Sequence, residues 1–154
     1  MKTSILLRDN LGSFIAEHEW QMNQNKICPN PAEDWYHIYG KIELISNDNY
    51  VLEVSDYMVS LIHHFLLSSI DAIKNGKDYT FDACSYVGTS TFVNKSKMVT
   101  IGDVSGKTAT FPQGKLIEDF KKMAKSGLTF MSSISLKEDE DMQNMLTHYN
   151  QLLK

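Results

Sequence analysis

The clearest pattern along the chain is a set of apolar residues that recur every three or four positions in its central part. They are Met58, Leu61, Ile62, Phe65, Leu66, Ile70 and Ile73. This spacing places all seven side chains on one face of an α-helix. Ser55 is a favourable N-cap, Asp56 complements the positive end of the helix dipole, and Gly76 can end the helix. We therefore predict a central helix that is capped by Ser55 and ends before Gly76.

Alternation of apolar and polar residues, which is typical of β-strands, occurs in several short stretches around this helix. They cover residues 4–8, 36–45, 50–54, 79–84, 91–93, 98–101 and 108–111. Residues 94–97 read as the turn of a hairpin. Residues 13–22 fit either a strand or a helix, and residues 23–34, with two prolines and three asparagines, fit a loop.

Two further helices are predicted after Pro112. The first carries its apolar residues on one face and lysines mostly opposite, from Lys115 to about Met131. The second begins at a capping box, Ser135 to Glu138, and its first turn holds the acidic run Glu138, Asp139, Glu140 and Asp141, which the helix dipole stabilises. Its apolar stripe runs from Met142 to Leu153.

Strands that precede helices, with hairpins between them, favour an α+β fold rather than a doubly wound one. We expect a largely antiparallel sheet with about three helices, one central and two C-terminal, packed on it. No internal repeat or low-complexity linker divides the chain, so residues 1–154 are expected to form a single domain.

Charge disfavours a nucleic-acid ligand. The net charge is −4, and residues 1–94 carry 6 basic and 12 acidic residues, a net charge of −6. Residues 95–125 carry 7 lysines and 3 acids, a net charge of +4, which fits a solvated helix face. Arg8 is the only arginine, whereas phosphate and base recognition favour the bidentate guanidinium. We expect no binding to nucleic acid.

A membrane protein is also disfavoured. A transmembrane helix needs about 18 or more consecutive apolar residues, and the apolar stretch from Met58 to Ile73 is interrupted by polar residues. The N-terminal residues lack the apolar core and the cleavage site of a secretory signal. We therefore expect a cytoplasmic protein that does not associate with membranes.

No catalytic, metal-binding or cofactor motif is recognised. The Gly-Lys-Thr at residues 106–108 follows Gly102 with too short a spacing for a phosphate-binding loop and leads into a strand. The five histidines have no metal-ligand spacing, since His63 and His64 are adjacent, and they read as surface or partly packed residues. Cys84 lies in a strand-like stretch and is expected in the core, and Cys28 in a loop. We predict no catalytic residue, no metal and no cofactor.

Two surface segments are candidates for binding a partner. Glu33, Asp34, Trp35 and Tyr36 place two acids beside two aromatic residues of the kinds enriched in interface hot spots. The acidic run Glu138, Asp139, Glu140 and Asp141 is the second candidate. The alternatives are that Trp35 opens a strand and fills the core, and that the acidic run only starts a helix.

The layout from Gly40 to Met131 resembles small α+β immunity proteins that are encoded beside bacterial contact-dependent growth-inhibition and related polymorphic toxins. The resemblance rests on the strand around Ile42-Glu43-Leu44, the central helix, the strand at residues 79–82, the hairpin and the helix from Lys115. It implies a protein that binds one cognate toxin domain with a basic surface and blocks its active site or substrate access. The alternative is a small cytoplasmic enzyme with unrecognised carboxylate or histidine chemistry, whose groups meet only in the fold.

Overall fold

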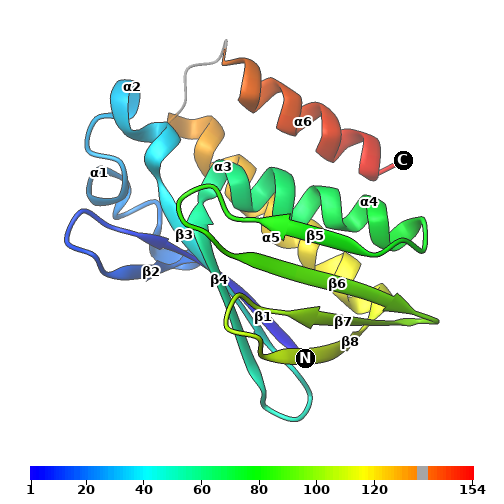
Figure 1. Ribbon diagram of the computed structural model, residues 1–154. Helices are drawn as coiled ribbons and strands as arrows, with labels where there is room; N and C mark the ends of the chain where they lie inside the picture. Colours follow the sequence, from blue (N-terminus) through cyan, green and yellow to red (C-terminus); the bar gives the residue numbers. More distant parts are fainter. Residues whose placement is uncertain (135–138) are drawn as a thin grey trace.

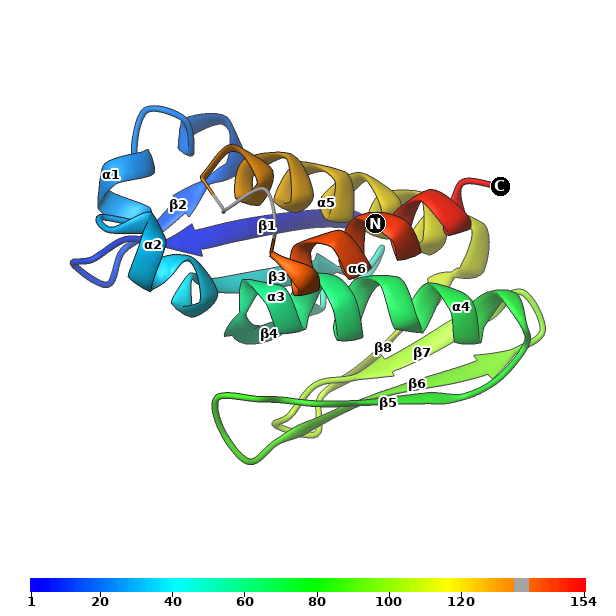
Figure 2. The same ribbon diagram turned by 90° about the horizontal axis from the view of Figure 1, so that it is seen from above.

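The computed structural model describes residues 1–134 and 139–154 and has an α+β architecture, as predicted. Two four-stranded antiparallel sheets surround a central helix, and two further helices pack beside it (Figures 1 and 2). One largely antiparallel sheet was predicted, whereas the strands form two separate antiparallel sheets. The helix between β4 and β5 separates them, so each sheet contains four strands that are close in sequence.

The first sheet, called sheet A here, has the strand order β2-β1-β3-β4. Its strands are β1 (Lys2–Arg8), β2 (Phe14–Ala16), β3 (Tyr39–Ile45) and β4 (Val51–Tyr57). The second sheet, sheet B, has the order β5-β6-β7-β8. Its strands are β5 (Tyr79–Asp82), β6 (Thr89–Lys95), β7 (Met98–Gly102) and β8 (Thr108–Pro112). The turn expected at residues 94–97 connects β6 to β7, and Ser96 adopts a positive φ of 60° there.

The central helix comprises α3 (Met58–Ser60), a π-helical stretch (Leu61–Leu67) and α4 (Ser68–Lys74). Its predicted apolar stripe is fully buried, and Leu67 is buried as well. The helix contacts β4, β5, α5 (Gln113–Ile134) and α6 (Glu140–Leu152). A helix with neighbours on several sides must be apolar over much of its circumference.

The start of this helix differs from the prediction. Ser55 and Asp56 belong to β4, and the helix begins at Met58. The carboxylate of Asp56 is buried and accepts hydrogen bonds from the amides of Cys84 and Ser85 at 2.7 and 3.0 Å. These amides lie in the loop after β5, far from Asp56 in sequence. The hydrogen bonds of Asp56 therefore could not be predicted from its neighbours along the chain.

A cluster of aromatic rings lies where the central helix meets sheet B and α5. The ring of Phe65 lies 5.3, 5.2 and 5.7 Å from those of Phe81, Phe92 and Phe120. Each of these four side chains is inaccessible to solvent, and such burial stabilises the fold by roughly 1.5–3 kcal/mol per side chain. On α5, Gly127 allows close helix contact, since an added Cβ would lie 2.8 Å from Cδ1 of Ile62.

The ambiguous N-terminal segments form short elements. Residues 13–22 contain the strand β2 and then one 3₁₀ turn, Glu17–Glu19, so the two alternatives each hold for part of the segment. Residues 23–34 are not paired in a sheet, but they include two one-turn helices, α1 (Gln24–Ile27) and α2 (Pro31–Asp34). A further 3₁₀ turn, Trp35–His37, leads into β3, whereas the sequence predicted a strand from Tyr36.

The two C-terminal helices form as predicted, but the apolar stripe of the second one ends at Leu152, because Leu153 lies beyond α6 and is exposed. Helix α5 buries Leu116, Phe120, Met123, Leu128 and Met131, among others. The predicted capping box at Ser135 to Glu138 lies outside the described residues. Helix α6 begins at Glu140, and Asp139 is its N-cap, because its side chain accepts the amide of Met142 at 3.1 Å. No helix within residues 1–134 and 139–154 combines the length and apolar character needed to cross a lipid bilayer.

Candidate functional site

The first predicted binding segment lies on α2 and the 3₁₀ turn after it. Glu33 is exposed, and Asp34 is half-buried and accepts the amide of Asn30 at 3.1 Å. Tyr36 is 38% exposed, whereas Trp35 is only 4% exposed. The Trp35 ring packs 4.3 Å from that of Tyr36. The buried Trp35 ring therefore anchors this segment to the core. The side chains that a partner could reach are those of Glu33 and Tyr36.

The second predicted segment starts α6. Asp139 is half-buried in its capping position, and Glu140 and Asp141 are exposed. Glu138, the remaining member of this prediction, lies outside the described residues. The positive end of the helix dipole stabilises these charges, so they have a structural role whether or not they bind a partner.

Both segments lie at the same end of the molecule, although more than 100 residues separate them in sequence (Figures 1 and 2). We call this region the acidic end and define it by Glu33, Asp34, Asp139, Glu140 and Asp141. Within the described part of the chain, none of these five carboxylates forms an ion pair with a cation. Carboxylates gathered at one end of a molecule create a negative potential there, which favours cationic partner surfaces.

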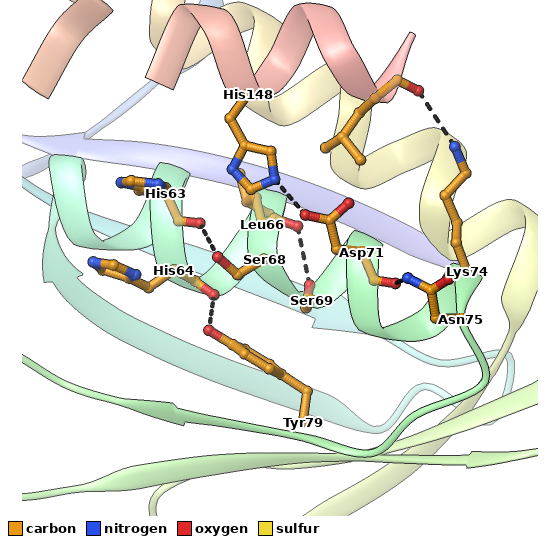
Figure 3. A network of polar contacts seen from close by, with 11 residues as sticks. His63, His64, Leu66, Ser68, Ser69, Asp71, Lys74, Asn75, Tyr79 and His148 are labelled. Carbon is orange, nitrogen blue, oxygen red and sulfur yellow. Dashed lines mark hydrogen bonds and ion pairs between the residues drawn. The ribbon is translucent and has the colours of Figure 1, made fainter. Parts of the chain in front are cut away.

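A second polar cluster lies on the central helix and α6 (Figure 3). The Nε2 atom of His148 lies 2.5 Å from Oδ2 of Asp71, and the two residues come from α6 and α4. The ring of His63 is stacked on that of His64 at 4.7 Å and lies edge-on to His148 at 5.6 Å. Three of the five histidines are thus brought together, which the sequence spacing did not reveal.

The electrostatics of this cluster favour a neutral His63. Burial lowers the pKa of its imidazole, and the neighbouring His64 and His148 lower it further. The pair of His148 and Asp71 has the form of a base oriented by a carboxylate. Within the described residues, no three histidine, cysteine, aspartate or glutamate side chains are arranged to hold a metal ion.

The π-helical stretch supplies carbonyl groups to the same network. The hydroxyl of Ser68 donates to the carbonyl of His63 at 2.9 Å, and the hydroxyl of Tyr79 donates to that of His64 at 2.7 Å (Figure 3). Burial raises the pKa of Tyr79, so its hydroxyl stays protonated and continues to donate at neutral pH. These hydrogen bonds hold the helix backbone at His63 and His64 in place.

Of the two cysteines, Cys28 lies in a loop as predicted, whereas Cys84, expected in the core, is exposed in the loop after β5. The amide of Cys84 donates to Asp56. Cys28 is buried, and burial together with the charge of Asp34 raises its pKa to about 11. A thiol with that pKa is protonated at neutral pH and is a poor nucleophile.

Comparison of the chain with known protein families, with curated proteins and with solved structures finds no match. The function therefore has to be inferred from the residues and the geometry described above.

Proposed function

We propose that this protein is an immunity protein that binds a cognate bacterial toxin domain and neutralises it. The observation that carries the proposal is the acidic end, where two segments distant in sequence place five carboxylates that form no ion pair among the described residues. The partner is then a domain with a basic surface, such as a nuclease, and binding covers its active site or blocks access of the substrate. The proposal places this protein in the cytoplasm, where the toxin acts.

Electrostatics gives this surface two effects on binding. Complementary charge accelerates association between proteins, and it disfavours partners of the same sign. Exposed charges are screened by salt, with a Debye length of about 8 Å at physiological ionic strength. Association with a basic partner is therefore expected to slow as salt increases.

The test is direct binding to the toxic domain encoded by the neighbouring gene, followed by an assay of its toxicity. We expect a 1:1 complex of nanomolar or higher affinity and loss of toxicity. The double variant Glu33→Lys, Glu140→Lys should slow association at low salt by at least tenfold. Glu118→Lys on α5 is the matched control, since that residue is exposed, belongs to a different part of the surface and forms only a surface ion pair with Lys122. No binding by correctly folded wild-type protein would overturn the proposal.

The second candidate function is that of a small enzyme, and the pair of His148 and Asp71 is the observation that favours it. A base oriented by a carboxylate can take a proton from a nucleophile or from substrate. Titration distinguishes the two functions, because a stoichiometric inhibitor abolishes toxicity only near equimolar amounts. An enzyme that inactivates the toxin acts at far lower ratios and is disabled by His148→Gln.

A further inference from the structure

The outer face of sheet A differs in composition from the rest of the surface. Strand residues alternate between the two faces of a sheet, and in β3 and β4 the residues facing the core are buried while their neighbours are only partly covered. At one end of this outer face lie Arg8, Tyr39 and Tyr57, and Tyr86 reaches it from the loop after β5. We call these four residues the tyrosine face. It contains three of the seven tyrosines and the only arginine of the chain.

Three side chains of the tyrosine face, those of Arg8, Tyr39 and Tyr57, contact one another. The guanidinium carbon of Arg8 lies 4.2 Å from the centre of the Tyr39 ring. Tyr39 and Tyr57 are cross-strand partners whose rings meet edge to face at 5.9 Å. His37 lies edge-on to Tyr57 at 5.7 Å, on the turn that follows α2. In the described residues, Arg8 forms no ion pair, so its N–H groups remain available to a ligand.

The loop that carries Tyr86 is anchored by a buried charge. Asp56 receives the amides of Cys84 and Ser85, and the hydroxyl of Ser85 lies 3.5 Å from that of Tyr39. Burial alone would raise the pKa of Asp56, but these hydrogen bonds lower it overall, so the anchor is charged at neutral pH. The next residue after Tyr86, Val87, is fully exposed. A loop fixed in this way loses little entropy when it contacts a partner.

Two pockets lie on either side of the tyrosine face. One has a volume of about 490 Å³ and includes Glu53, Ser55, Tyr86, Asp103, Val104 and Lys107 in its lining. The other, of about 250 Å³, includes Arg8, Asp9, Asp34, His37 and Tyr39. Together they present four carboxylates (Glu53, Asp103, Asp9 and Asp34) and two cations (Lys107 and Arg8), a net charge of −2 with His37 neutral.

We infer that the tyrosine face is a protein-docking surface and that its occupant is the basic toxin domain of the proposed function. Tyrosine and arginine are the residues most enriched in interface hot spots, especially where they are preorganised. The net negative charge of the two pockets suits a basic protein and opposes a nucleic acid. Asp34 belongs both to the smaller pocket and to the acidic end, so the two surfaces are continuous. The inference rests on the proposed function and adds the contact that holds the complex together.

The experiment measures the affinity of variants for the toxic domain encoded by the neighbouring gene, by calorimetry, after circular dichroism has shown that each variant is folded. We expect Tyr86→Ala and Arg8→Ala each to weaken binding at least tenfold, mainly through faster dissociation. Tyr149→Ala, a half-buried tyrosine on α6, is the matched control and should bind like the wild type. Hydrogen exchange in the complex should show protection in residues 84–88 even for a variant that binds weakly.

Each alternative result has a definite meaning. If the tyrosine-face variants bind like the wild type while the acidic-end variants are impaired, the inference is overturned and the proposed function stands. If the wild type does not bind at all, the proposed function fails and the inference fails with it. Self-association of the wild type that is lost in Tyr86→Ala, or binding of a single-stranded oligonucleotide that competes with the toxic domain, would assign the face to another occupant and overturn the inference.

Discussion

Sheets A and B have the same number of strands and the same antiparallel pairing, and both bury one face against the helices, yet their outer faces differ. The outer face of sheet B is dominated by threonines in adjacent positions of neighbouring strands. These are Thr80, Thr89, Thr91, Thr100, Thr108 and Thr110. Sheet A presents tyrosines and charged residues instead, with the smaller pocket at its edge, and the larger pocket lies between β4 and the β7–β8 connection of sheet B.

The difference shows which sheet face has a role beyond folding. Threonine is a favourable strand residue whose hydroxyl is readily solvated, so these threonines need no partner to be explained. The half-buried rings of Tyr39 and Tyr86 border the pockets and that of Tyr57 packs against Tyr39, and strand formation does not require such an arrangement. The connection between β5 and β6 belongs to sheet B but reaches the edge of sheet A, where Asp56 holds it. Five experiments can break or sharpen this comparison.

The largest loss of stability is expected from substitutions on the buried faces, which are apolar in both sheets. Phe92→Ala in sheet B should lower the free energy of unfolding by about 3–5 kcal/mol, because its ring is inaccessible and packs against Phe65 and Phe120. Leu44→Ala in sheet A should cost about 2–5 kcal/mol for the same reason. Urea denaturation measures both values. A loss below about 1 kcal/mol in either variant would mean that the sheet does not form part of the common core.

Removal of the anchor between the sheets should have the next largest effect. Asp56→Ala leaves the amides of Cys84 and Ser85 without their acceptor, which costs about 1–3 kcal/mol. It should also weaken toxin binding, since Tyr86 then loses its fixed position. Asp48→Ala, at an exposed turn position, is the control. Normal stability and normal binding of Asp56→Ala would show that the loop is held by other contacts.

The same anchor predicts a dependence on pH. The pKa of Asp56 is lower in the folded protein than its ordinary value of 3.8. Its contribution to the free energy of unfolding is therefore complete above pH 3.8. Stability is then lost as the pH falls through the lowered folded-state pKa. The wild type should lose more stability than Asp56→Ala between about pH 5 and about pH 2. If the wild type and Asp56→Ala lose the same amount of stability, Asp56 does not contribute to the destabilisation in acid.

A smaller effect is expected at His63, on the helix that lies between the two sheets. Because burial and the facing His64 and His148 lower its pKa, the unfolded chain binds a proton more readily than the folded one. Stability should therefore fall as the pH drops below the ordinary histidine pKa of 6.5, and rise again on return to neutral pH. His63→Gln should flatten this part of the profile, and His18→Gln, at an exposed position, should leave it unchanged.

The features that could be predicted from sequence are those set by nearby residues. The apolar stripe from Met58 to Ile73 predicts the central helix because a helix repeats over a few positions, and the turn at residues 94–97 is equally local. Asp56 was misassigned because its amide partners lie 28 and 29 residues away and outweigh its local preference for a helix start. Cys84 was misplaced for the same reason.

The candidate sites show the same limit. The acidic segments at residues 33–34 and 139–141 could be identified from composition, but not the fact that they share one end of the molecule. Contact of His148 with Asp71 spans 77 positions, and no spacing rule covers such a distance. The contact of Arg8 with Tyr39 depends on the pairing of β1 with β3. That pairing cannot be predicted from the sequence of either strand alone.

The smallest effect is expected on the outer face of sheet B, and it decides whether the comparison holds. The hydroxyls of Thr100 and Thr110 form a cross-strand hydrogen bond of 2.8 Å, which Thr100→Val removes while keeping a β-branched side chain. Cross-strand pairs of this kind contribute about 0.2–1 kcal/mol, so stability should change by no more than that. Affinity for the toxic domain should not change, because the threonines lie on sheet B, away from the tyrosine face. Weakened binding with unchanged stability would place the partner on sheet B, and the two outer faces would then have to be regarded as one extended contact.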